Sequence, residues 1–181
     1  MELAREWAAR GVSVLRMDIG GVGDSDARFG AVDNHPYPDH AVENIASAVR
    51  WMKDRARVSR VIVAGLCSGA HASFHAGLAV DGMAGIMVIN PFVFYWNPAC
   101  DVLLVFSEGD PGLDFVKRRY ARSLRLLEQR SSNFALRVIP DADHTFTRRA
   151  ARRRLTGLLS SHLTPRHAER GLSLGVRPVT R

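Results

Sequence analysis

Apolar residues along this chain gather into short runs that alternate with longer stretches of mixed character. The short runs predict strands at 12–19, 58–64, 83–90, 101–106 and 134–139. The longer stretches predict helices at 2–10, 39–55, 68–80, 114–129 and 148–162. Because the strands are largely apolar throughout and alternate with helices, we expect an α/β domain. Its core would be a mainly parallel sheet of about five strands with helices on both faces.

One domain accounts for residues 1–163, and residues 164–181 form a basic tail without periodicity that we expect to be disordered. The chain of 181 residues is long enough for a core, and its 46% hydrophobic and 24% charged residues are ordinary for a globular protein. No apolar run has membrane-spanning length, and the first residues lack a signal-peptide core. We therefore predict a cytoplasmic protein with no membrane partner.

The formal net charge of +7 raises the question of nucleic-acid binding. Much of the excess lies in Lys117–Arg130, Arg148–Arg154 and residues 167–181, without the interleaved aromatic residues of a stacking platform. We therefore predict no nucleic-acid partner, and a basic nucleic-acid-binding module remains a third, minor interpretation. The two cysteines, Cys67 and Cys100, are too few for a disulfide framework or a cysteine metal cluster.

The strand predicted at 58–64 runs into Gly65-Leu66-Cys67-Ser68-Gly69, and a helix of small residues follows. This spacing is that of a nucleophile elbow, a sharp strand-to-helix turn that presents its central residue, here Cys67. The turn requires tiny flanking residues where strand and helix nearly touch, and Gly65 and Gly69 meet that need. The alternative is a glycine turn beside an inert, buried cysteine.

Other residues with chemical potential also follow predicted strands. Gly20 and Gly21 begin a glycine loop after the strand at 12–19. Asp110 follows the strand at 101–106, and His144 follows the strand at 134–139. Loops beyond the carboxyl ends of parallel strands lie at one edge of the sheet, so we expect these residues to meet Cys67 there. The glycine loop lacks the G-x-G-x-x-G spacing of a dinucleotide site, so no cofactor is predicted.

The order of elbow nucleophile, acid and histidine, each after its own strand, resembles the α/β-hydrolase fold. The matching strings are Gly65–Gly69, Leu103–Pro111 and Pro140–Phe146, together with the glycine loop Asp18–Ser25. Within that superfamily the chain is most similar to S33-type serine aminopeptidase-like hydrolases. Two strings, Gly65–Ala70 and Phe106–Gly112, resemble hydrolases associated with bacterial exopolysaccharide gene clusters. The resemblance implies an ester or thioester hydrolase with a small-molecule acyl substrate, no metal, and substrate binding by Gly20 and Gly21.

The resemblance also implies a role for each residue of the site. Cys67 would attack the acyl carbon, helped by the helix dipole, which favours a thiolate. His144 would take the thiol proton and later protonate the leaving group, while Asp110 would orient the imidazole. The backbone N–H of Ser68 would supply one donor of the oxyanion hole.

Plainer interpretations stand beside these roles. His144 could merely cap a loop. Asp110 lies in a turn-forming Gly-Asp-Pro-Gly string, and Asp141 and Asp143 are turn formers too, but Asp110 follows the strand that the family uses.

Two further clusters carry no predicted chemistry. His71 and His75 stand four apart, but no third ligand accompanies them, so we predict packing histidines rather than a metal pair. The aromatic patch Phe92–Trp96 is expected in the core or in a pocket wall.

Departures from the family pattern bear on activity. The chain begins at what looks like the helix after the family's third strand, so the loop with the second oxyanion donor is missing, and so is the cap domain. The third strand would lie between the strands that end at Asp18 and Ala64, and its absence predicts a gap in the sheet. Cysteine also replaces the commoner serine. These departures leave two other interpretations possible. One is a non-catalytic remnant with a binding or assembly role, and the other is a homodimer whose partner completes the sheet.

Overall fold

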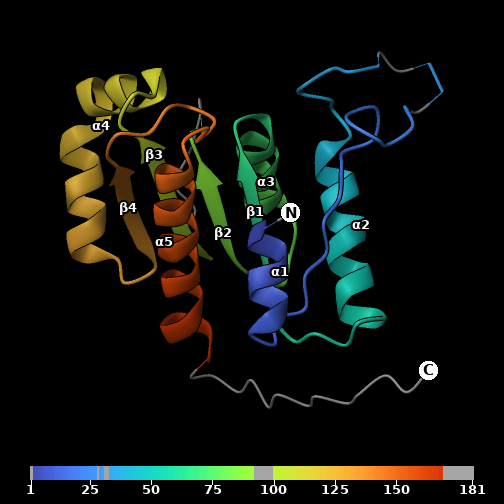
Figure 1. The fold of residues 1–181 in the computed structure, drawn as a ribbon. Coiled ribbons are helices and arrows are strands. Elements are labelled where there is room, and N and C mark those ends of the chain that lie inside the picture. Colours follow the sequence, from blue (N-terminus) through green and yellow to red (C-terminus); the bar gives the residue numbers. More distant parts are fainter. Residues whose placement is uncertain (1, 28, 31–32, 92–99, 169–181) are drawn as a thin grey trace.

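Four parallel strands lie side by side in the order in which they occur in the chain (Figure 1). The computed structural model describes residues 2–27, 29–30, 33–91 and 100–168. The strands are β1 (Val61–Leu66), β2 (Met83–Ile89), β3 (Asp101–Ser107) and β4 (Phe134–Ile139). Helices connect β1 to β2 and β3 to β4, as parallel pairing requires. The predicted α/β class is therefore confirmed, with one strand fewer than expected among the described residues.

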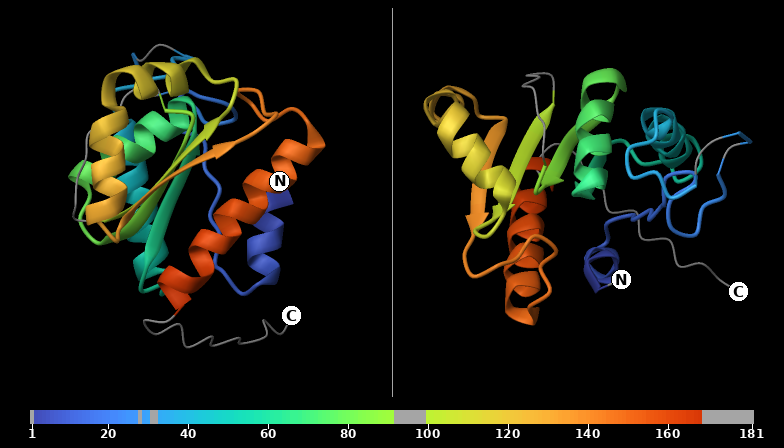
Figure 2. Two further views of the ribbon diagram at one scale, coloured as in Figure 1. Left: turned by 90° about the vertical axis from the view of Figure 1, so that its left-hand side faces the viewer. Right: turned by 90° about the horizontal axis from the view of Figure 1, so that it is seen from above.

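Helices cover both faces of the sheet. They are α1 (Glu2–Ala9), α2 (Ala41–Asp54), α3 (Ser68–Ala79), α4 (Pro111–Arg130) and α5 (Arg149–Ala168). The sheet lies between a layer formed by α3 and α4 and a layer formed by α1 and α5 (Figure 2, right). Val88 packs in a core cluster on the face covered by α3 and α4. Its neighbour Met87 packs in a second core cluster on the face covered by α1 and α5, and each residue is only 1% exposed. This two-sided burial explains why the strands are apolar at consecutive positions.

The α2 helix packs outside α3 rather than on the middle of the sheet. Ile45 and Val49 of α2 are buried in a third cluster with Ala72 and Ala76 of α3. The small residues of α3 allow this approach, because α3 contacts the sheet on one side and α2 on the other. The loop before α2 is thereby held near the start of α3.

The strand predicted at 12–19 is wrong, because this segment does not pair with the sheet. In Figure 1 it is the blue stretch of chain that rises from α1 toward the loop before α2. Among the described residues β1 pairs only with β2, so β1 is an edge strand. Val12, Leu15 and Met17 are 38 to 42% exposed. An apolar segment forms a strand only when a neighbouring strand supplies hydrogen-bond partners, and no described strand lies next to this one.

Several boundaries differ from the prediction. The α4 helix begins at Pro111 rather than 114, and α5 continues to Ala168, past the predicted start of the tail at 164. The rest of the predicted tail and the aromatic patch Phe92–Trp96 lie outside the described residues. No helix in the described part of the chain is long and apolar enough to cross a membrane.

Candidate active site

Cys67 lies in a sharp turn between β1 and α3. Its backbone has φ 56° and ψ −114°, a left-handed conformation that residues other than glycine rarely adopt. Its N–H donates to the Ile89 carbonyl at 3.0 Å, which fixes the turn to the end of β2. A methyl group on Gly65 would overlap the backbone of Gly69, so the close approach of strand and helix requires glycine at 65. The predicted elbow is therefore present.

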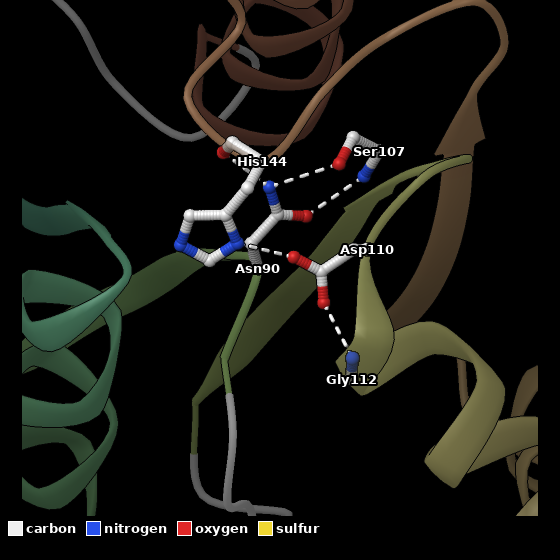
Figure 3. A network of polar contacts seen from close by, with 5 residues as sticks. All are labelled: Asn90, Ser107, Asp110, Gly112 and His144. Carbon is white, nitrogen blue, oxygen red and sulfur yellow. Dashed lines mark hydrogen bonds and ion pairs between the residues drawn. The ribbon is translucent and has the colours of Figure 1, made fainter.

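Asp110 lies in the loop after β3 and is only 2% exposed. One carboxylate oxygen accepts a hydrogen bond from the Gly112 N–H at 2.7 Å, which caps the start of α4. The other oxygen contacts Nδ1 of His144 (Figure 3). Asp110 is thus both a turn former and the partner of the imidazole, which joins the two interpretations that the sequence kept apart.

His144 lies in the loop after β4, and its side chain is 29% exposed. The loops after β3 and β4 are joined by their backbones, since Gly109 N–H donates to the Ala142 carbonyl at 3.2 Å. In Figure 3 the second ring nitrogen of His144 points away from Asp110. One nitrogen therefore faces a buried acid, and the other is presented on the opposite side of the ring.

Sequence analysis missed Asn90, which holds this arrangement together. Asn90 is fully buried, with φ 50°, at the end of β2. Its amide nitrogen donates to the His144 carbonyl at 2.7 Å, and its amide oxygen accepts from the Ser107 N–H at 2.7 Å. The available signal was a polar residue that closes an apolar strand and tolerates left-handed backbone.

The end of β2 also relates Cys67 to His144. Cys67 is bonded through its backbone to Ile89, and the next residue, Asn90, is bonded to the His144 backbone. The elbow and the acid–imidazole pair therefore lie at the same edge of the sheet, above neighbouring strands. Ser68 is the first residue of α3, where backbone N–H groups have no partner within the helix.

The glycine loop is held by α2 and the residues just before it. Gly20 N–H donates to Asn44 Oδ1 at 2.8 Å, and the Gly20 carbonyl contacts His40 Nε2 at 2.9 Å. Ile19 and Val22, on either side of Gly20 and Gly21, line a pocket of about 370 Å³ that Ser68 and Gly69 also line. Gly20 and Gly21 are not on the wall of that pocket, and their role in substrate binding stays a prediction.

The two competing acids have local partners. Asp143 accepts a hydrogen bond from Thr147 N–H at 2.8 Å and contacts the Thr147 hydroxyl. The hydrogen bonds from Thr147 lower the pKa of Asp143 below its ordinary value. Asp141 lies 3.6 Å from Arg154, with its side chain 74% exposed. The carboxylate that contacts His144 is therefore that of Asp110.

His71 and His75 pack against each other on α3, with ring centroids 4.3 Å apart. Burial, and then the charge of His75, lower the pKa of His71.

Tyr37 was missed by sequence analysis and places its ring edge-on to His71, with centroids 5.1 Å apart. Burial, and then the nearby Cys67, raise the pKa of Tyr37. No cluster that could hold a metal ion occurs among the residues with described positions.

Comparisons with known proteins agree with this fold. No protein of curated function matches the sequence significantly. A crystal structure of a protein of unknown function from Agrobacterium tumefaciens, provisionally assigned to the α/β hydrolases, superposes with a TM-score of 0.71 at 20% identity. That match covers 98% of this chain and 79% of the other.

An esterase from Pyrococcus furiosus superposes with a TM-score of 0.56 at 16% identity, over 69% of this chain and 61% of the esterase. At such identities the two structures share the fold with this chain. The family model for serine aminopeptidase, S33, matches residues 1–154, which is most of the sequence. This chain therefore belongs to the S33 serine aminopeptidase family within the α/β-hydrolase superfamily.

Proposed function

We propose that this protein is an acyl hydrolase that cleaves an ester or thioester of a small molecule through Cys67, His144 and Asp110. The observation that carries the proposal is the contact between His144 Nδ1 and the buried Asp110 carboxylate. This pair lies at the sheet edge where the left-handed turn presents Cys67. An acid–imidazole pair beside such a turn is the arrangement that activates a nucleophile.

The reaction proceeds in two displacements. His144 accepts the proton of the Cys67 thiol, and the sulfur forms a bond to the acyl carbon while the carbonyl π electrons move to oxygen. The intermediate collapses, the bond to the leaving alkoxide or thiolate breaks, and the imidazolium returns its proton to that group. Water, deprotonated by His144, then attacks the acyl-cysteine. The bond between the sulfur and the acyl carbon breaks, the imidazolium returns its proton to the Cys67 sulfur, and the carboxylic acid leaves. Asp110 fixes the tautomer and stabilises the imidazolium in both displacements.

The start of α3 supplies electrostatic stabilisation. Ser68 is the first residue of α3, so its N–H and the positive end of the helix dipole would stabilise the negative charge that forms on the carbonyl oxygen. The pocket of about 370 Å³ beside Ser68 has mostly apolar walls, which include Ile19, Val22 and Val42. A pocket of this size and character suits a short acyl chain.

The test is hydrolysis of p-nitrophenyl butyrate and of a butyryl thioester by the wild-type chain and by Cys67→Ala. We expect turnover by the wild type and a loss of roughly 1000-fold or more in kcat/KM for Cys67→Ala. Cys100→Ala is the matched control, because Cys100 is the other cysteine, is buried, and lies outside the site. Hydrolysis that is equally fast in both variants would remove Cys67 from the mechanism.

A second candidate function is a non-catalytic role in binding or assembly. It is favoured by the edge of β1 that no described strand pairs with. Val61–Leu66 carry no charged residue, and an uncharged edge strand is a template for pairing with another chain. A homodimer in which a partner strand extends the sheet is the form this role would take. Light scattering on a hydrolytically inactive protein distinguishes the two: a stable dimer supports assembly, and a monomer at all concentrations contradicts it.

A further inference from the structure

Tyr37 lies on the loop before α2 and packs against α3 near Cys67. Burial raises the pKa of Tyr37, and Cys67 is close enough to the phenol to raise it further. The Tyr37 ring meets the ring of His71, in the first turn of α3, at an interplanar angle of 82°. His71 is itself tied to the elbow, because its N–H donates to the Cys67 carbonyl at 3.1 Å. Packing on the helix that follows the elbow therefore holds Tyr37 close to Cys67.

Tyr37 and Ser68 also face the same space. Both line the pocket of about 370 Å³ beside the start of α3. One is a phenol on the loop before α2, and the other is the residue whose N–H opens α3. Two hydrogen-bond donors from different elements thus border one pocket next to the elbow, while His144 comes from the loop after β4.

A hydrogen-bond donor near the Cys67 sulfur is well placed to stabilise the negative charge that forms on the substrate during the attack. When the Cys67 sulfur bonds to an acyl carbon, negative charge leaves the sulfur and appears on the carbonyl oxygen, two bonds away. Burial and the proximity of Cys67 raise the pKa of Tyr37, so the phenol stays protonated and can donate at neutral pH. Its hydroxyl is then available to donate to that oxygen.

We infer that Tyr37 is a catalytic residue that donates the second hydrogen bond of the oxyanion hole, opposite the N–H of Ser68. This inference rests on the proposed acyl hydrolysis at Cys67. A phenol serves here because a preorganised donor aimed at developing charge stabilises the transition state more than the bound ester.

The experiment compares Tyr37→Phe with Tyr120→Phe on p-nitrophenyl butyrate. The two tyrosines are matched, being 40% and 41% exposed, and Tyr120 lies on α4 away from the site. We expect kcat to fall roughly 100-fold in Tyr37→Phe with KM changed less than about threefold. Tyr120→Phe should match the wild type. A Tyr37→Phe enzyme with wild-type kcat overturns the inference while leaving Cys67 as nucleophile, whereas a wild type without turnover overturns the proposed function and this role together.

A second measurement needs no substrate. The chain has three tyrosines, so 3-fluorotyrosine labelling gives few ¹⁹F resonances, which the two Phe variants assign. We expect the Tyr37 resonance to move when Cys67 is replaced by alanine, and the Tyr120 resonance to stay in place. A Tyr37 resonance that ignores Cys67→Ala would show that the phenol does not contact the nucleophile.

Discussion

Gly65 lies where β1 and the first turn of α3 come closest. A Cβ there would meet the carbonyl carbon and oxygen of Gly69, whereas a Cβ on Gly69 has no described atom within 4 Å. The sequence motif treats these two glycines as equivalent. At the scale of single residues only Gly65 is sterically required, because its side of the turn faces backbone that cannot move aside.

Gly65→Ala should therefore destabilise the protein strongly, and Gly69→Ala should not. We expect Gly65→Ala to lower the free energy of unfolding by roughly 3 kcal/mol or more, since backbone must shift to admit the methyl group. For Gly69→Ala the free energy should stay the same or rise by up to about 1 kcal/mol, because alanine favours helix. Urea denaturation measures both, and equal losses would contradict the difference.

The start of α4 shows how one residue serves an element and a site together. Asp110 caps the helix through Gly112, and Pro111 at the first helical position has no N–H to satisfy. The absence of a side chain at Gly112 is needed too, because a Cβ there would lie 2.7 Å from Asp110 Oδ1. The helix boundary therefore fixes the carboxylate that faces His144.

Two substitutions of Asp110 separate these tasks. Asp110→Asn keeps a cap of equal quality, so the free energy of unfolding should stay within about 0.5 kcal/mol of the wild type. Asp110→Ala loses the cap and the His144 contact, and should cost about 2 kcal/mol. Both variants should lose roughly 100-fold or more in kcat for the ester, because the imidazole loses its charged partner. Thermal unfolding and initial rates test this, and an active Asp110→Asn would contradict the catalytic role.

The two ends of the described chain meet across one face of the whole molecule. The α1 helix lies beside α5 (Figure 1). Trp7 of α1 packs against the core cluster that contains Leu159 of α5, and its Nε1–H donates to the buried Ser160 hydroxyl at 3.0 Å. Residues more than 150 positions apart thus share one contact. The α1 helix is thereby held over the sheet although it carries no fully buried residue of its own.

Removing this contact should affect the stability of the whole fold. Trp7→Ala should lower the free energy of unfolding by about 2 kcal/mol, from the lost burial and the lost hydrogen bond. Trp51→Ala is the matched control, because Trp51 is 52% exposed on α2 and should change stability by less than about 0.5 kcal/mol. Chemical denaturation followed by circular dichroism compares the two variants. Equal effects would mean that α1 is not part of the cooperative unit.

Most of the elements and the candidate site residues could be predicted, but the contacts between them could not. The strands β2, β3 and β4 follow from apolar runs, and the elbow follows from Gly65 and Cys67. Asn90 and Tyr37 escaped prediction because each acts across the fold, on residues that follow other elements. The segment 12–19 was mispredicted. Its hydrophobicity indicates that it could form a strand, but not whether a neighbouring strand is present to pair with it.

The sequence by itself determined the alternation of strands and helices, the turn at Cys67 and the order of the chemical groups, because these depend on local spacing and backbone freedom. Only the tertiary structure showed that the predicted Asp110 contacts His144 while Asp141 and Asp143 have other partners, and that Tyr37 lies close to Cys67. It also decided that β1 is an edge. Such facts depend on which distant segments pack together, and burial favours many pairings that sequence spacing alone cannot rank.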